Sequence, residues 1–120
     1  KVRDTGLDIQ WKLYQLLISK GGNPVIIDSR ELLINPEFIL TKLCAHLKIN
    51  YSKEMLSWNP GPINEDGIWS KYWYETVHKS STFMPYKPKP DLQKKFLPLY
   101  NKCLPYYNKL YKHALVAKRS

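Results

Sequence analysis

Pro24-Val25-Ile26-Ile27-Asp28-Ser29 is the stretch of sequence on which the fold depends. Three consecutive β-branched residues between a proline and a polar cluster predict a short, fully buried strand. No other run of four or more residues has strand character, so we expect this strand to lack a partner within the 120 residues. Unpaired buried backbone groups cost on the order of 1–3 kcal/mol each. The rest of the sheet is therefore expected outside this sequence, in a missing N-terminal portion or another chain, which also fits the absence of an initiator methionine.

Helical patterns surround the strand. Residues 5–20 place apolar side chains at helical spacing, and Gly21-Gly22 ends this helix because glycine readily adopts the left-handed conformation. Asn35-Pro36-Glu37 predicts the start of a second helix: the asparagine caps it, proline suits its first position, and glutamate complements the positive end of the helix dipole. Ser52 is expected to open a short helical turn. The chain should therefore be mostly helical, with one short strand.

The positive charge lies in the last third of the chain. The formal net charge is +9, yet residues 1–78 hold nine basic and nine acidic side chains. Residues 79–120 hold ten basic side chains and a single acidic one, Asp91. Residues 84–90 are expected to form an extended Pro/Lys linker. Residues 91–117 have helical periodicity and predict a terminal basic amphipathic helix that Pro98 and Pro105 kink or restart.

This terminal helix has two interpretations. Lysines interleaved with tyrosines are typical of a nucleic-acid-binding surface. However, Lys95, Lys102 and Lys109 recur every seven residues on one flank, opposite the apolar stripe, as in a solvated amphipathic helix. Arginine, the favoured reader of bases and phosphates, is scarce here. We favour solvation over nucleic-acid binding, and keep as the alternative function a non-catalytic basic helical module that binds nucleic acid, anionic lipid or a partner protein.

The composition excludes several classes of protein. With 43% hydrophobic and 24% charged residues, it is typical of an ordinary globular domain. No apolar run approaches the ~20 residues of a membrane span, and no signal peptide is recognisable, so a cytoplasmic location is expected. Cys44 and Cys103 are expected to be buried, reduced thiols, and the three histidines show no metal-ligand spacing. No self-contained catalytic motif is present.

A first candidate site follows the strand directly. Asp28-Ser29-Arg30-Glu31 lies where ligands bind in open α/β sheets, beyond the carboxyl end of a strand. The favoured interpretation is nevertheless structural. Asp28 or Ser29 would cap the next turn, with Arg30 and Glu31 solvated.

A second candidate site comprises Gly61-Pro62 and residues 66–82, of which Gly67–Thr82 is the stretch expected to contribute to ligand binding. It combines Lys71, His78 and Lys79 with hydroxyl groups and broad aromatic rings. This mixture suits a phosphorylated or sulfated nucleotide, whose base stacks on the rings while its phosphates meet the cations. The favoured alternative, on residue chemistry alone, is that the aromatic residues pack in the core and His78 is a hydrogen-bonded surface residue.

Two blocks of this sequence resemble the C-terminal half of the sulfotransferase family. The first contains the strand described above and continues through Asn35-Pro36-Glu37 to Leu47. The second, more specific block contains Asp66-Gly67-Ile68-Trp69, Tyr72-Trp73-Tyr74 and Val77-His78-Lys79-Ser80. The resemblance spans roughly residues 5–115. It is strongest to a subgroup of P-loop-like sulfotransferase proteins, some of which carry aminotransferase-like names.

The resemblance implies a three-layer α/β fold around a parallel sheet, of which residues 1–120 are a single partial domain at the C-terminal side. It implies transfer of a sulfuryl group from 3′-phosphoadenosine 5′-phosphosulfate to a small hydroxyl or amine acceptor, without a metal. The family's phosphosulfate-binding loop and usual catalytic base belong to the N-terminal half. We therefore assign no catalytic residue and expect this chain to be inactive alone.

Within that resemblance, Lys71, His78, Lys79 and Ser80 are the candidates for binding the nucleotide donor. One motif departs from the family pattern. Ser80-Ser81-Thr82-Phe83 stands where the family has Ser-Thr-Gly-Phe. A positive φ at that position would strain Thr82, because β-branched residues rarely adopt it. An altered loop is therefore expected there.

Overall fold

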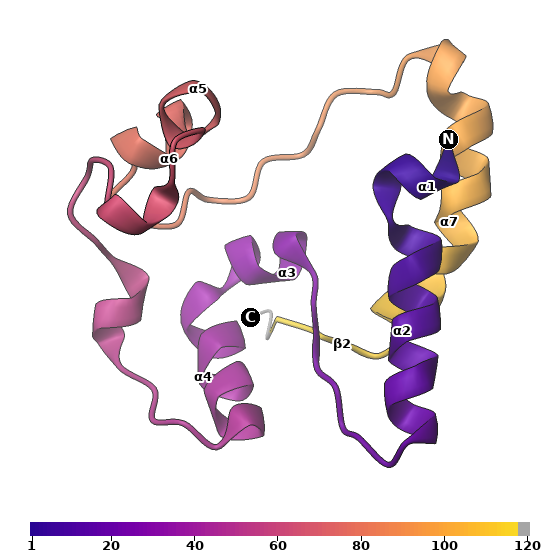
Figure 1. Ribbon diagram of the computed structural model, residues 1–120, viewed down its shortest axis with the longest axis horizontal. Coiled ribbons are helices and arrows are strands. Elements are labelled where there is room, and N and C mark those ends of the chain that lie inside the picture. The colour runs from indigo at the N-terminus through magenta and orange to yellow at the C-terminus, as the bar shows by residue number, and fades with distance from the viewer. Residues whose placement is uncertain (118–120) are drawn as a thin grey trace. The chain divides into compact units, whose positions relative to one another are not determined.

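The computed structural model describes residues 1–117, apart from the side chain of Trp73 (Figure 1). The chain divides into two compact units. The first combines Lys1–Ser29 with Lys87–Val116, and the second contains Arg30–Tyr86 and Ala117. None of the helices in residues 1–117 combines the length and apolar character that a membrane crossing requires.

The first unit is built on two helices that pack side by side (Figure 1). Short helix α1 precedes α2, which starts after Gly6, a residue with a φ of 71°. Gly21 follows α2 with a φ of 81°, so the predicted helix and its glycine stop are confirmed. The elements of this unit are α1 (Val2–Thr5), α2 (Leu7–Ser19), β1 (Ile26–Ile27), η3 (Lys94–Phe96), α7 (Leu97–Tyr111) and β2 (Ala114–Leu115).

The predicted strand forms, but the expectation that it lacks a partner in this chain is wrong. Strand β1 pairs in parallel with β2, with Ile26 opposite Ala114 and Ile27 opposite Leu115. Parallel strands need a crossover connection, and here the crossover runs through most of the chain. Strand β2 is only two residues long and continues the 3–4-residue spacing of the preceding helix. Its sequence therefore carries no strand signal of its own.

Helix α7 is shorter than the helix expected over residues 91–117. It begins at Leu97 and ends at Tyr111, and residues 83–93 have no regular secondary structure. Pro98 lies in its first turn, where a missing N–H costs nothing, whereas Pro105 lies inside the helix without ending it. Cys103 and Leu110 are buried on one side of α7, and Lys95, Lys102 and Lys109 are exposed.

The second unit has its core on helix α4. Ile39 is completely buried there, and Cys44, 3% exposed, is a free thiol, as is buried Cys103. Glu31 contradicts the expectation of a solvated side chain, because it is completely buried on α3. The elements are α3 (Ser29–Ile34), which begins at the boundary between the units, α4 (Pro36–Leu47), η1 (Lys53–Leu56), η2 (Asn64–Asp66), α5 (Ser70–Trp73) and α6 (Glu75–Lys79).

The cap of α4 forms as predicted, and it supplies a stability test. The Asn35 side chain accepts a hydrogen bond from the backbone N–H of Phe38 at 3.1 Å, and Pro36 occupies the first helical position. We expect Asn35→Ala to lower the free energy of unfolding by about 1 kcal/mol, because one helix-end donor loses its acceptor. Urea unfolding followed by circular dichroism measures this. Asn35→Asp, which keeps the acceptor, should stay close to wild type, and an equal loss in both variants would contradict the assignment of the cap.

Candidate functional site

The stretch from Gly67 to Thr82 folds into two short helices that meet at Tyr74. Tyr74 donates its backbone N–H to the Ser70 carbonyl at 2.9 Å and accepts from the His78 N–H at 2.7 Å. The side chains of Trp69, Tyr72 and Val77 are 64%, 64% and 60% exposed. The interpretation of this stripe as core packing is therefore wrong for these three residues. The rings of Trp69 and Tyr72 are therefore largely exposed in this chain.

His78 is held by the Asp66 carboxylate, to which sequence reasoning assigned no role. Its Nε2 atom lies 2.9 Å from Asp66 Oδ2, and both side chains are largely buried. The same oxygen accepts the backbone N–H of Ile63 at 3.1 Å. Asp66 lies twelve residues before His78, so no helical periodicity connects them. The sequence placed Asp66 in the Asp66-Gly67-Ile68-Trp69 block of the resemblance but gave no sign of its contact with His78.

Ser80 is fixed by a second residue that sequence reasoning did not assign to the site. The indole N–H of Trp58 donates to Ser80 Oγ at 3.1 Å, and that hydroxyl donates to the Val77 carbonyl at 2.6 Å. The backbone of Trp58 also donates to the Ser81 carbonyl at 2.8 Å. Ser80 therefore sits at the end of α6 in a defined rotamer, tied to the loop before η2.

The two candidate lysines are exposed and lightly held. Lys79 Nζ lies 2.9 Å from Glu75 Oε1, one helical turn earlier, with both side chains about three-quarters exposed. Lys71 Nζ lies 4.9 Å from the ring centroid of Tyr72. Exposed ion pairs of this kind contribute little to stability, so both ammonium groups are available to an anion. The structure brings His78, Lys79 and Ser80 together at the end of α6, whereas Lys71 lies on α5.

The expected strain at Thr82 does not occur. Thr82 forms an antiparallel bridge with Ser57, and within residues 1–117 the only residue other than glycine with a positive φ is Lys48. Phe83 packs edge-on against the Trp58 ring, with centroids 5.3 Å apart. The threonine is therefore accommodated in extended backbone, where its side chain is favourable.

Of the residues that follow β1, Asp28 has a structural contact. Tyr107 donates its hydroxyl proton to Asp28 Oδ2 at 2.6 Å, which ties the end of β1 to α7 within the first unit. Asp28, Ser29 and Tyr107 line a cavity of about 250 Å³. Ser29 is the first residue of α3, and the predicted cap by Asp28 or Ser29 stays a prediction. Arg30 is exposed.

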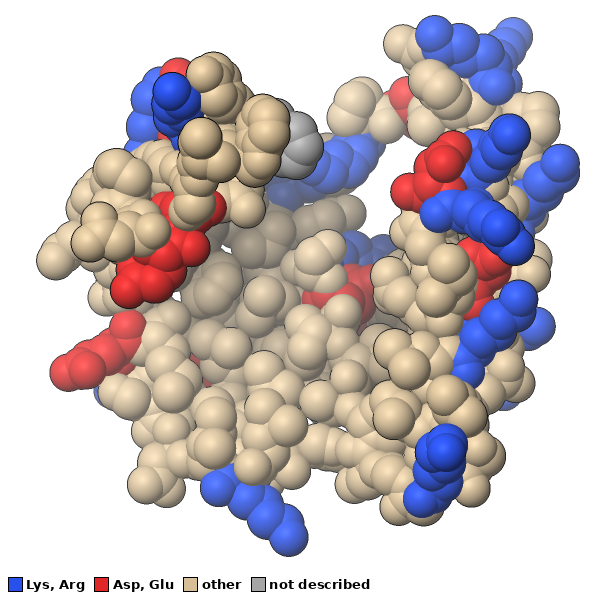
Figure 2. All heavy atoms as spheres, in the orientation of Figure 1, with Lys and Arg blue, Asp and Glu red and all other residues tan. Residues whose placement is uncertain are grey.

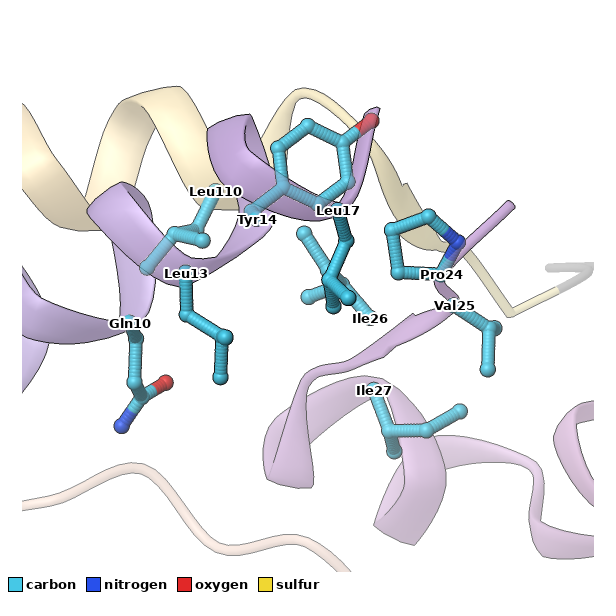
Figure 3. Close-up of a pocket in the computed structure, with 9 residues that line it drawn as sticks. All are labelled: Gln10, Leu13, Tyr14, Leu17, Pro24, Val25, Ile26, Ile27 and Leu110. Atoms are coloured by element: carbon cyan, nitrogen blue, oxygen red, sulfur yellow. The ribbon is translucent and has the colours of Figure 1, made fainter. Parts of the chain in front are cut away.

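A second cavity in the first unit, of about 240 Å³, lies between α2 and β1 (Figure 3). The lining comes mainly from apolar side chains of both elements, and Gln10 is the residue with an amide group among them. No ionisable carboxylate, lysine, histidine or cysteine lines this cavity. Its lining is therefore mostly apolar and presents few polar groups to a ligand.

Most of the excess positive charge lies on the first unit. In Figure 2, Lys and Arg side chains gather over α1, α2 and α7, and a separate basic group lies over α5 and α6. On α7, Lys109 Nζ lies 5.8 Å from the Trp11 ring centroid and 5.7 Å from that of Tyr106. Within the described residues, no group of three or more potential metal ligands from His, Cys, Asp and Glu lies together.

Comparison with known proteins decides the family. The model of the sulfotransferase domain family matches residues 3–114, which is nearly the whole chain. The chain belongs to the sulfotransferase domain family. The resemblance inferred from its motifs is therefore confirmed, and the mostly helical architecture with a small parallel sheet is compatible with a portion of an α/β fold.

Two plant relatives of this sulfotransferase-family chain have a different kind of name. The branched-chain-amino-acid aminotransferase-like protein 2 of Arabidopsis thaliana is 41% identical over 111 residues, covering 92% of this chain. The aminotransferase-like protein 1 of the same plant is 40% identical over 106 residues, covering 82%. This chain spans only 20% and 19% of the length of those two proteins. No solved structure matches the chain significantly.

We expect the Asp66 carboxylate to make the free energy of unfolding depend on pH in the acidic range. The hydrogen bond from the Ile63 backbone, and then the one to His78, lower the pKa of Asp66 below its ordinary value, while burial acts in the opposite direction. Because its pKa is lower in the folded than in the unfolded state, its contribution is complete above the unfolded pKa and is lost as pH falls through the folded pKa. We expect the urea midpoint of Asp66→Asn to fall less between about pH 5 and pH 2.5 than that of wild type. Parallel pH curves for the two proteins would contradict this role.

Proposed function

We propose that this chain is the C-terminal portion of a sulfotransferase domain and that its Gly67–Thr82 segment helps to bind 3′-phosphoadenosine 5′-phosphosulfate. The complete domain would transfer the sulfuryl group of that donor to a hydroxyl or amine acceptor. The observation that carries the proposal is the concentration of cations, hydroxyl groups and open aromatic faces on one segment of a sulfotransferase-family chain.

The proposed roles follow from how each side chain is held. Lys79 and Lys71 are exposed ammonium groups that meet phosphate or sulfonate oxygens, with Lys79 exchanging Glu75 for the ligand. Ser80 presents a hydroxyl already oriented by Trp58. His78, when protonated, adds a charge-assisted hydrogen bond, which is about twice as strong as a neutral one. The exposed rings of Trp69 and Tyr72 suit stacking against the adenine base.

The architecture of the first unit supports a larger sheet. A parallel sheet is ordinarily covered on both faces and has more than two strands, whereas β1 and β2 here are two residues each. On α2, Ile9, Leu13 and Leu16 are 54%, 52% and 49% exposed. We propose that these strands belong to a three-layer α/β fold whose other strands, phosphosulfate-binding loop and catalytic base come from outside these 120 residues.

The aminotransferase-like names describe the two plant proteins and are not carried to this chain. The chain corresponds to about a fifth of each of them, and nearly all of it matches the sulfotransferase model. The alternative function, a basic binding module, rests on α7. Its lysines keep to an exposed flank, and Lys109 contacts the chain's own aromatic rings, as a solvated helix does. No observation favours it over the donor site.

Thermal unfolding in the presence of nucleotide tests the proposal. The probe is the product nucleotide, 3′-phosphoadenosine 5′-phosphate, added to the polypeptide in the longest form in which the cell makes it. At 100 times the dissociation constant, a ligand that binds only the folded protein stabilises it by about 2.7 kcal/mol. We expect a clear rise in the unfolding midpoint, and a smaller rise with adenosine 5′-phosphate, which lacks the 3′-phosphate. No rise with either nucleotide, or equal rises with both, would contradict the proposal.

A further inference from the structure

Asp66 makes two hydrogen bonds through a single oxygen. Its Oδ2 atom accepts the Ile63 backbone N–H at 3.1 Å and lies 2.9 Å from His78 Nε2. The Asp66 side chain is 22% exposed and the His78 side chain 16%. Within the described residues, the carboxylate and the imidazole therefore form a partly desolvated pair, in which screening by water is weaker than at the surface.

The backbone and ring of His78 are held independently of this pair. Its N–H donates to the Tyr74 carbonyl and its own carbonyl accepts the Gly61 N–H, both at 2.7 Å. The imidazole lies edge-on to the Tyr74 ring, with centroids 6.0 Å apart and planes at 85°. These contacts limit the ring to a narrow range of orientations. Asp66 then decides which nitrogen faces the protein.

The second ring nitrogen of His78 is open. No hydrogen bond joins Nδ1 to any of the described residues. His78 therefore has one nitrogen directed to Asp66 and a second that makes no hydrogen bond within the described residues.

We infer that Asp66 is a positioning residue, which holds His78 with Nε2 toward the protein so that Nδ1 is the nitrogen that meets the bound nucleotide. This inference rests on the proposed function and names an atom within its site. In the imidazolium form both ring nitrogens carry protons. Nε2–H then donates to Asp66 and Nδ1–H donates to a phosphate or sulfonate oxygen. The arrangement corresponds to the carboxylate–histidine pairs that fix ring orientation at metal sites.

The surroundings leave Asp66 as the carboxylate that acts on His78. On the histidine's own helix, Glu75 and Lys79 pair with each other at 2.9 Å. From the neighbouring elements, Tyr74 presents its ring and Gly61 its backbone. Within residues 1–117, His78 forms its ion pair with Asp66. Removing Asp66 should therefore free the ring to present either nitrogen.

The first test needs no nucleotide. In a long-range ¹H–¹⁵N spectrum of the free protein, we expect a hydrogen-bonded, slowly exchanging Nε2 proton on His78. It should disappear in Asp66→Ala, shift upfield in Asp66→Asn, whose amide oxygen is a weaker acceptor, and persist in Asp66→Glu. Circular dichroism verifies that each variant is folded. If Asp66→Ala does not fold, the result with Asp66→Asn decides the test. An Nε2 proton that is unchanged by these substitutions would overturn the inference.

The second test is a double-mutant cycle on affinity for 3′-phosphoadenosine 5′-phosphate. We expect Asp66→Ala to weaken binding about fivefold to tenfold in wild type and to have no further effect in a His78→Ala background, because coupled residues are not additive. Asp66→Glu should restore most of the affinity. Equal losses in both backgrounds would overturn this inference and leave the proposed function intact. If wild type does not bind the nucleotide, the proposed function fails, and with it the ligand-facing role of Nδ1.

Discussion

Replacing Ile39 with alanine is expected to lower the free energy of unfolding by about 2–5 kcal/mol. Ile39 lies on α4, and its side chain is completely excluded from solvent. Among the aliphatic side chains of residues 1–117, it is the one with no exposed surface. Removing three carbon atoms from such a site loses their transfer free energy and leaves a cavity that its neighbours fill only in part. Because small domains are marginally stable, this single change should remove much of the stability of the second unit.

Urea unfolding monitored by tryptophan fluorescence measures this effect. Trp58 and Trp69 lie in the same unit as Ile39 and report on it directly. The matched control is Ile49→Ala in the same unit, where the side chain is 53% exposed and the loss should be within about 0.5 kcal/mol. If the two substitutions had similar costs, Ile39 would not lie in the core of the second unit.

Replacing His78 with alanine is expected to weaken binding of 3′-phosphoadenosine 5′-phosphate by about 10–100-fold. The estimate follows from the loss of one charge-assisted hydrogen bond, typically about 1.5–3 kcal/mol. The substitution also leaves Asp66 without its partner, and an unpaired, partly buried carboxylate next to an anionic ligand is unfavourable. Isothermal titration calorimetry measures the change.

His46→Ala is the control for this measurement. His46 also lies in the second unit, on α4, and outside the proposed donor segment. It should leave the affinity within about twofold of wild type if His78 acts through its own contact with the nucleotide. Equal losses in the two variants would indicate a general loss of folding, and unchanged affinity in His78→Ala would remove this residue from the site.

Short sequence motifs predicted the helix caps and the helix end, which depend on contacts between residues close in the sequence. Asn35 caps α4, Ser52 caps η1 by accepting the Glu54 N–H, and glycine follows α2. In each case the interaction joins atoms only a few residues apart, so a short motif contains all the information. Buried Cys44 and Cys103 were predicted for a similar reason, because residue type alone strongly biases burial.

Interactions between distant residues were not predictable in this way. The pairing of Ile26 with Ala114 spans 88 positions and depends on two short strands. The Asp66–His78 contact depends on the path of the loop between η2 and α5. The burial of Glu31 also depends on elements that pack around α3. Sequence chemistry proposed the members of the candidate site, which stay a prediction, but it assigned no role to Asp66 or Trp58, which contact His78 and Ser80.

The measurement that tests the central claim most directly is photolabelling with 8-azido-3′-phosphoadenosine 5′-phosphate, followed by peptide mapping. The polypeptide is used in the longest form in which the cell makes it, with and without excess unlabelled nucleotide. We predict label on the Gly67–Thr82 segment that the unlabelled nucleotide prevents, because this segment carries the exposed rings of Trp69 and Tyr72 that are proposed to stack on the adenine base. Protected label found only outside that segment, or no protected label anywhere in the protein, would contradict the claim that this segment helps to bind the donor.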